Sequence, residues 1–438
     1  MSRLLSLLTI LAALAAVPAV AAAAPPWSAP ATVPGAFGSV TPIVVTPSGS
    51  AALLAAVSRT AAGSPPQTPS ELFALAANGQ PGTGQPVSVA AGFLATYAKG
   101  HIAVAGSTLH NGTIDDRSHV AVALGTPASL GTARGLTGST GQRVFGLAGN
   151  VRGDVAVLTG NANSVRTLYV RRAGSTTFRV VLKIAVSRSQ ARDATVALGP
   201  KGDALVVWED KHVIFARHLG PTGNAGAVHK IGDGVQSNLQ AAIDDKSRLE
   251  VAWKSQRVNE GESNAAADVR FTTAAPGHGF GPQRTIETIN AGHFVGAPGI
   301  RLVPEGNGRT LVAWTGFDGT HFVVRAADFA DGHRATPQTV SPTGVDAVLG
   351  DAAARTGGEA TVVWRAGVLG ADPAAGVNPT LFASHRDAGQ TTFAAPEQIS
   401  ETGENVATPP SAALDPVSGS SFVVYAPLSA GLKVSVRP

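Results

Sequence analysis

The chain repeats a short phrase in which a glycine turn leads into a continuous apolar run that ends in an aromatic residue. The phrase is clearest as GDALVVW, residues 202–208, and returns with a terminal Trp or Tyr at 308–314, 358–364 and 419–425. An apolar run without alternation is typical of a strand that is buried on both faces. We therefore predict that each copy forms such a strand and that its terminal residue, the anchor, packs in the core.

Weaker copies extend this repeat over most of the chain. The anchors recur about every 53 residues and are Ala55, Gly106, Thr159, Trp208, Trp253, Trp314, Trp364 and Tyr425. Within each unit, one apolar segment precedes the phrase and two strand-like segments follow it, separated by turns rich in Gly, Asp and Pro. Four short strands in about 50 residues are typical of one β-propeller blade. The predicted fold is all-β, a single propeller of four-stranded blades, eight in number, with seven as the alternative.

A second recurring phrase marks the last strand of a unit, as in FGPQRTI at 280–286 and ATPQTVS at 335–341. The same pattern, WSAPATV, occurs at 27–33, before the first unit begins. The last unit, from about residue 401, has room for only three strands. We therefore predict that residues 27–33 complete the last blade and close the ring, because closure leaves no unpaired strand edge.

This pattern resembles that of secreted bacterial β-propeller proteins of the sialidase-like and WD40-like repeat types, over nearly all of the chain. The resemblance implies the fold, but propellers host many unrelated activities, so it implies no particular activity. The sequence also lacks the S-x-D-x-G-x-T-W and R-I-P phrases of sialidases and the recurring Trp-Asp dipeptide of WD40 repeats.

Residues 1–23 have the layout of a secretory signal peptide, which leaves 24–438 as a single propeller domain. An arginine precedes an apolar run, and small residues follow at the A-x-A spacing. The run is shorter than the roughly 20 residues of a spanning helix, and no later apolar run is longer. We expect a secreted protein, extracellular or periplasmic, without stable membrane insertion.

Composition and charge narrow the chemistry. The sequence has no cysteine, which excludes disulfides, thiol nucleophiles and cysteine-ligated metals. The net charge of +4 is spread over the chain without a basic run, which argues against a nucleic-acid partner. No motif for a metal, a nucleotide or a known catalytic centre occurs, so we expect no cofactor and no metal. We expect a monomer.

The candidate site residues are charged residues in predicted loops. Turns between the second and third strands of a blade and links between blades open on one propeller face, the usual ligand face. The candidates on this face are Asp115, Asp116, Arg117, Glu209, Asp210, Arg257, Glu260 and Glu262. We predict that Glu209 and Asp210 begin the loop that follows the strand ending in Trp208.

Three functional hypotheses fit these residues. The first is an exported, non-catalytic binding module for a glycan, a peptide or a cell-envelope protein. The second is a carbohydrate-active enzyme, a hydrolase or a lyase, with Glu209, Glu260 and Glu262 as candidate catalytic carboxylates. The third is a structural protein of the envelope. A sialidase would use a tyrosine nucleophile, and all three tyrosines of the chain lie in strand-like phrases.

Overall fold

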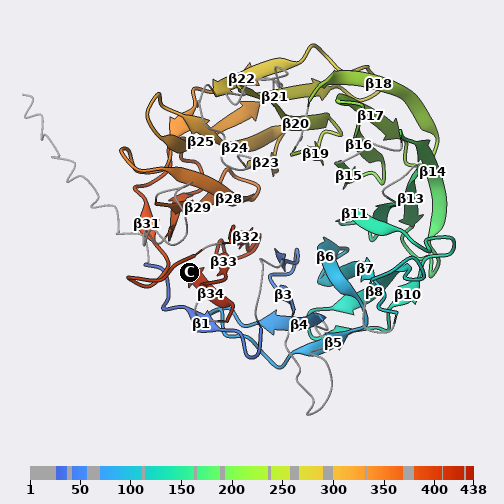
Figure 1. Cartoon of the computed structure of the whole chain (residues 1–438), viewed down its shortest axis with the longest axis horizontal. Helices are drawn as coiled ribbons and strands as arrows, with labels where there is room; N and C mark the ends of the chain where they lie inside the picture. Colours follow the sequence, from blue (N-terminus) through green and yellow to red (C-terminus); the bar gives the residue numbers. More distant parts are fainter. Residues whose placement is uncertain are drawn as a thin grey trace, which may run out of the picture.

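The repeated apolar phrase forms the second strand of eight antiparallel sheets that are arranged around a central axis (Figure 1). In this computed structural model the described residues are 26–36, 42–56, 70–110, 114–161, 165–187, 193–234, 238–256, 266–289, 299–330, 333–367, 379–406, 408–428 and 431–438. Every regular element in these ranges is a strand. The described residues contain no helix long and apolar enough to span a membrane. The predicted all-β propeller with eight blades is confirmed.

Each of the first four blades is one antiparallel meander, and its strands are named here in order from the central axis outward. Blade 1 comprises β2 (Ile43–Val45), β3 (Ala51–Ala56), β4 (Ser70–Leu75) and β5 (Gln85–Val87). Blade 2 comprises β6 (Ala90–Tyr97), β7 (His101–Ser107), β8 (Val120–Thr126) and the short strands β9 (Ser129–Leu130) and β10 (Arg134–Gly135). Blade 3 comprises β11 (Arg143–Gly149), β12 (Val155–Gly160), β13 (Val165–Arg171) and β14 (Arg179–Ala185). Blade 4 comprises β15 (Ala194–Leu198), β16 (Ala204–Asp210), β17 (Val213–Leu219) and β18 (Ala225–Asp233).

The other four blades continue the ring in chain order. Blade 5 comprises β19 (Gln240–Ile243), β20 (Leu249–Gln256), β21 (Ala267–Ala274) and β22 (Arg284–Ile289). Blade 6 comprises β23 (Ile300–Gly306), β24 (Arg309–Phe317), β25 (Phe322–Ala330), β26 (His333–Arg334) and β27 (Gln338–Thr339). Blade 7 comprises β28 (Ala347–Ala354), β29 (Ala360–Ala366), β30 (Thr380–Arg386) and β31 (Glu397–Gln398). Blade 8 comprises β32 (Ser411–Leu414), β33 (Ser421–Tyr425), β34 (Lys433–Arg437) and β1 (Ala31–Thr32).

The N-terminal strand closes the ring, as the sequence predicts. β1 is the outermost strand of blade 8, where Ala31 pairs with Val434 and Thr32 with Lys433 (Figure 1). The innermost strands of blades 1 and 8, β2 and β32, also pack against each other. Blade 8 is therefore built from both ends of the described chain, and its sheet keeps four strands.

The anchors pack between neighbouring blades. Trp253, Trp314, Trp364 and Tyr425 are fully buried and Trp208 is nearly so, which confirms their predicted place in the core. Some innermost strands, such as β28 and β32, are rich in small residues where the blades approach each other closely. A Cβ atom on Gly350 of β28 would lie 2.3 Å from Pro410, in the link to blade 8. A larger residue at Gly350 would therefore force these two blades apart.

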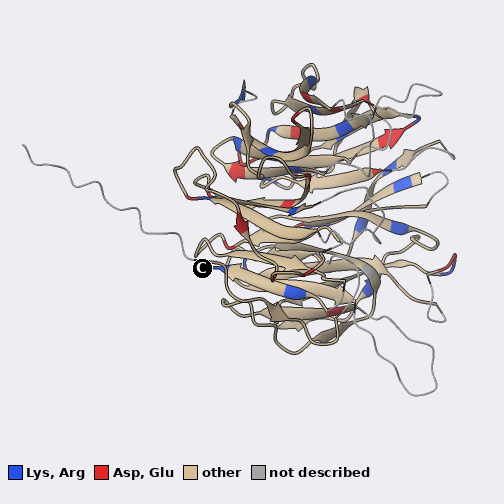
Figure 2. Ribbon diagram, turned by 60° about the vertical axis from the view of Figure 1, so that its left-hand side comes forward, with Lys and Arg blue, Asp and Glu red and all other residues tan. Residues whose placement is uncertain are grey.

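The ring has two faces with different connections. We call one the link face: it carries the turns between second and third strands and the links between blades. We call the other the turn face: it carries the remaining turns within each blade. Charged side chains are few, and both signs are mixed over the blades (Figure 2).

Candidate functional site

The predicted candidates Asp115, Asp116 and Arg117 lie on the link face, between β7 and β8. The carboxylate of Asp115 accepts the backbone N–H groups of Arg117 at 2.9 Å and Ser118 at 3.0 Å, and its other oxygen lies 2.9 Å from Nδ1 of His110. Desolvation raises the pKa of Asp115, but the hydrogen bonds outweigh it and hold the pKa below its usual value. Asp115 therefore shapes its own turn, while Asp116 and Arg117 are exposed.

The predicted position of Glu209 and Asp210 is wrong. Both lie inside β16 and pair with β17, because the turn that follows consists only of Lys211 and His212, with positive φ angles of 50° and 64°. A two-residue turn of this kind matches the twist of the flanking strands and lets pairing continue to the end of the hairpin. Glu209 is fully buried, and Asp210 is half-buried.

The remaining candidates, Arg257, Glu260 and Glu262, lie outside the described residues. The structure does not bring the other five together, since the turn of Asp115 belongs to blade 2, whereas Glu209 belongs to blade 4 and blade 3 lies between them. Across the described ranges, no group of three His, Asp or Glu side chains is placed to hold a metal ion.

A half-buried acid that the sequence analysis missed adjoins Glu209. Asp193 immediately precedes β15; its carbonyl oxygen accepts the backbone N–H of Glu209 at 3.0 Å, and its carboxylate accepts that of Leu239 at 2.9 Å. Burial, reinforced by the charge of Glu209, raises the pKa of Asp193 to about 6. Asp193 thus joins the first strands of blades 4 and 5 and holds a proton in mildly acidic solution.

The position directly after the anchor carries a charge in three blades: Glu209, Lys254 and Arg365. Lys254 is buried, and burial lowers its pKa to about 7; burial also lowers the pKa of Arg365. The sequence contains the signal for these residues, since each charge interrupts a second strand directly after a tryptophan. These are interior charges of the link face and do not belong to solvated loops.

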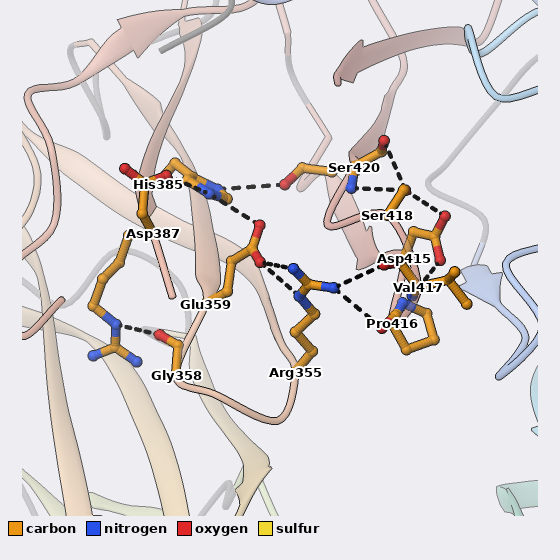
Figure 3. Close-up of polar contacts among 12 residues, drawn as sticks. Arg355, Gly358, Glu359, His385, Asp387, Asp415, Pro416, Val417, Ser418 and Ser420 are labelled. Carbon is orange, nitrogen blue, oxygen red and sulfur yellow. Dashed lines mark hydrogen bonds and ion pairs between the residues drawn. The ribbon is translucent and has the colours of Figure 1, made fainter. Parts of the chain in front are cut away.

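A dense polar cluster joins blades 7 and 8 on the turn face (Figure 3). The guanidinium of Arg355 donates from Nε to Glu359 at 2.5 Å and from Nη1 to the carbonyl oxygens of Pro416 and Val417 at 3.1 and 3.3 Å. The other carboxylate oxygen of Glu359 lies 3.4 Å from Nε2 of His385. We call this group the blade 7–8 cluster. Its contacts cross the interface, so it holds the two blades together.

The imidazole of His385 is the buried member of the blade 7–8 cluster. It is buried, and its Nδ1 lies 2.9 Å from the hydroxyl of Thr361, which contacts the hydroxyl of Ser421 in blade 8 at 2.6 Å. Burial and the nearby positive charge of Arg437 lower the pKa of His385 to about 4. The ring is therefore neutral at physiological pH and serves as a hydrogen-bonding bridge between blades.

Blades 6 and 7 are joined in a similar way by Arg386. Its side chain is buried and bonds to Glu305, to Asp328 at 2.7 Å and to the carbonyl oxygen of Gly358 at 2.7 Å. Burial raises the pKa of Glu305 to about 7 even beside this guanidinium. Arg386 is enclosed by partners within the protein, which assigns it to the packing of the ring.

A different arrangement occurs between blades 2 and 3, where a cavity of about 600 Å³ opens. Its walls include Tyr97, Arg134 and Arg171 together with residues 175–178. The outer strand of blade 2, β10, has only two residues, whereas β14 of blade 3 has seven. The short strand leaves the outer part of this interface unfilled. We call this space the blade 2–3 cavity.

Two cations face this cavity without acidic partners. The half-buried Arg171 donates to the carbonyl oxygens of Ser175 at 2.8 Å and Gly153 at 3.1 Å, and its guanidinium lies 5.1 Å from the centre of the Tyr97 ring. In the described part of the chain neither Arg171 nor the exposed Arg134 forms an ion pair. Their positive charge is available to an anionic ligand.

Aromatic and hydroxyl groups accompany these cations. Tyr97 is 8% exposed, and its hydroxyl makes no hydrogen bond to any described residue. Burial raises the pKa of Tyr97 although Arg171 opposes this, so the phenol keeps its proton and can donate a hydrogen bond. Phe178 and the hydroxyls of residues 175–177 complete the wall. Chemically, this wall can bind a ligand that has an apolar face, hydroxyl groups and a negative charge.

Comparisons with known proteins identify the fold and no more. No family model matches the sequence, and no curated protein is similar to it. The solved structure of the Dos1 propeller is 10% identical, with a TM-score of 0.52 over 94% of this chain and 95% of Dos1. A polysaccharide lyase of family PL25, an ulvan lyase, is 11% identical, with a TM-score of 0.45 over 92% of this chain and 95% of the lyase. A prolyl endopeptidase is 12% identical, with a TM-score of 0.42 over 74% of this chain, which spans only 46% of that enzyme.

The resemblance expected from the sequence is confirmed at the level of the β-propeller fold, by the likeness to Dos1. A sialidase from the Hadza microbiota is also among the similar structures, with 11% identity and a TM-score of 0.36 over 84% of this chain and 73% of the sialidase. At these identities a likeness shows the fold alone. Secretion and membership of a particular propeller family stay predictions.

Proposed function

We propose that this protein is a non-catalytic binding module that holds a glycan in the blade 2–3 cavity. The observation that carries the proposal is Arg171, stacked against Tyr97 without an acidic partner in the described chain, at the wall of a cavity of about 600 Å³. Small-molecule sites commonly have this volume. The half-buried ring of Phe178 offers an apolar surface to a sugar, and the phenol, guanidinium and hydroxyl groups bond to its oxygens.

The groups at this cavity support binding more directly than catalysis. Hydrolysis of a glycoside uses two carboxyl groups on either side of the bond that breaks. The side chains that line the blade 2–3 cavity contribute guanidinium, hydroxyl and aromatic groups instead. Such groups orient a sugar and neutralise its charge.

We also propose that the protein works outside the cytoplasm as a monomer. The support is the signal-peptide pattern of residues 1–23 together with the closed ring, in which β1 covers the outer edge of β34 in blade 8 and offers a second chain only a two-residue edge. Glycans of the cell envelope or its surroundings are the ligands accessible to a protein in that place.

A glycan array probed with the purified protein tests this proposal, followed by calorimetric titration of each hit. We expect Arg171→Gln to weaken binding at least tenfold, because one charged hydrogen bond to a ligand is worth about 1.5 to 3 kcal/mol. Arg284→Gln, at an exposed position on β22 of blade 5, is the matched control and should bind like the wild type. Unchanged binding in Arg171→Gln would assign the ligand to another site, and an array without hits would refute the proposed function.

A carbohydrate-active enzyme is the second candidate, favoured by the two acids Asp193 and Glu209, which are held next to each other by a backbone hydrogen bond. Asp193, whose pKa burial raises to about 6, is suited to donate a proton, and Glu209 would be the second carboxyl group of the pair. This candidate requires turnover of a polysaccharide that is lost in both Asp193→Asn and Glu209→Gln. Turnover that survives either substitution would exclude the pair.

A further inference from the structure

A second cavity adjoins the same blade as the first. It measures about 310 Å³ and lies between blades 3 and 4, where Lys183 and Ala185 of β14 face Trp208 and Arg217. The opposite end of β14 begins directly after Phe178, which lines the blade 2–3 cavity. We call the second space the blade 3–4 cavity. One outer strand therefore connects two cavities.

The two cavities have the same kinds of groups. In the blade 3–4 cavity the half-buried ring of Phe215 packs on the core anchor Trp208, with centres 5.7 Å apart and an angle of 21°. Phe215 is the ring that a sugar can reach there, as the half-buried Phe178 is in the first cavity. Arg217 donates from Nε to the carbonyl oxygen of Gly226 at 2.9 Å. Aromatic faces beside cations are suited to sugars that carry negative charge.

The charges of the blade 3–4 cavity are mainly positive. Lys183 and Arg217 form no ion pair with any described residue. The one acid in the lining, Asp210, accepts the backbone N–H of Ser187 at 3.0 Å and lies 3.4 Å from its hydroxyl. Asp210 is thus already bound by the protein, and two cations are available to a ligand.

The outer strand between the cavities is also basic and exposed. β14 begins with Arg179, which is exposed and has no ion pair among the described residues, and Val180 beside it is 44% exposed. The seven residues of β14 span about 23 Å at about 3.3 Å per residue. This length accommodates several sugar rings in an extended chain.

Building on the proposed function, we propose that the ligand is a linear acidic polysaccharide with repeated carboxylates, which follows β14 and occupies both cavities. Guanidinium groups bind carboxylates through paired hydrogen bonds, and the aromatic rings stack on sugar faces. Once part of the polysaccharide fills the first cavity, binding of the same chain to the second cavity is an intramolecular step. Affinity therefore rises with chain length beyond what the added contacts alone would give.

Calorimetric titration of the purified protein with uronic-acid oligomers of two and eight sugars tests this inference. We expect the octamer to bind at least tenfold more tightly than the dimer. Arg217→Gln should remove most of that gain, whereas Arg171→Gln should weaken the binding of both dimer and octamer. The control is Arg284→Gln, because Arg284 is the first residue of β22 just as Arg179 is the first residue of β14. Circular dichroism verifies that each variant is folded.

The outcomes separate the inference from the proposed function. Equal affinity for dimer and octamer, or full octamer affinity in Arg217→Gln, overturns the two-cavity mode. Equal binding of the methyl-esterified octamer overturns the acidic ligand and leaves glycan binding standing. Binding of poly-glutamate without binding of any glycan overturns both proposals, and so does a complete absence of binding.

Discussion

The blade 7–8 cluster and the blade 2–3 cavity each place an arginine between two blades, but the two arginines have different partners. Arg355 bonds to Glu359 and to two carbonyl oxygens of the neighbouring blade. Arg171 bonds to carbonyl oxygens of its own blade and lies against the ring of Tyr97, with no acid beside it in the described chain. The first arginine is satisfied within the protein, whereas the second keeps its capacity for an anion.

This difference distinguishes charges that hold the fold from charges that can serve a ligand. Polar groups buried in a folded chain are nearly all paired, since an unpaired one costs stability. A charge that stays unpaired beside an open cavity has another reason to be there. The comparison leads to four predictions. Substitutions in blades 6–8 should lower stability, whereas substitutions in blades 2 and 3 should weaken ligand binding.

The largest effect is expected from Arg386→Met. It removes one of the two arginines that contact Glu305 and Asp328 and leaves the buried Glu305 with only the 3.5 Å contact to Arg309 among the described residues, at a cost of about 3 to 4 kcal/mol in the free energy of unfolding. Urea denaturation measures it. A loss below about 1 kcal/mol would show that this network does not hold blades 6 and 7 together.

His385 makes part of the stability depend on pH. Its pKa is about 4 in the folded chain, against an ordinary value of 6.5 for the unfolded chain, so between these values the unfolded chain binds the proton more readily. The neutral His385 therefore contributes its full share to the free energy of unfolding above pH 6.5. This share falls by roughly 3 kcal/mol as the pH is lowered toward 4. Comparing urea denaturation of the wild type and His385→Gln at pH 7, 5.5 and 4 isolates it. Parallel pH profiles in the two proteins would contradict the buried neutral ring.

Arg171→Gln should reverse the pattern of Arg386→Met. We expect a stability change below about 1 kcal/mol, because Arg171 has no ion pair with any described residue, together with at least tenfold weaker glycan binding. Denaturation and calorimetry on one preparation give both values. A large loss of stability with intact binding would place Arg171 in the same class as Arg386.

The smallest effect is expected from Tyr97→Phe. This change removes the hydroxyl that has no partner among the described residues and keeps the ring that Arg171 contacts. Binding should weaken by about threefold to tenfold, the range of one neutral hydrogen bond, and stability should stay constant. Destabilisation would mean that the hydroxyl is bonded within the protein.

Much of the fold follows from the sequence because packing repeats with the blades. Each second strand is enclosed by neighbours on both faces, so its apolar run and its anchor recur, and Trp314 or Trp364 can be placed in the core from the pattern alone. The closing strand is predictable too, since a three-stranded last unit needs a fourth strand and residues 27–33 carry the matching phrase.

The site is not repeated, and the sequence pattern therefore does not reveal it. Glu209 looks like a loop residue, but the turn after β16 has only two residues, so Glu209 still pairs with β17. The blade 2–3 cavity exists because β10 pairs over only two residues, a consequence of register that periodicity does not record. Arg171 and Tyr97 come from different blades and meet only after the ring forms.

The most direct test of this account is a crystal structure of the protein with an acidic oligosaccharide of about eight sugars. The account predicts sugar density in the blade 2–3 cavity, with a carboxylate against Arg171 and a sugar ring against Phe178, continuing along β14 toward Arg217. Density confined to the link face or to the central axis, with the blade 2–3 cavity empty, would contradict it.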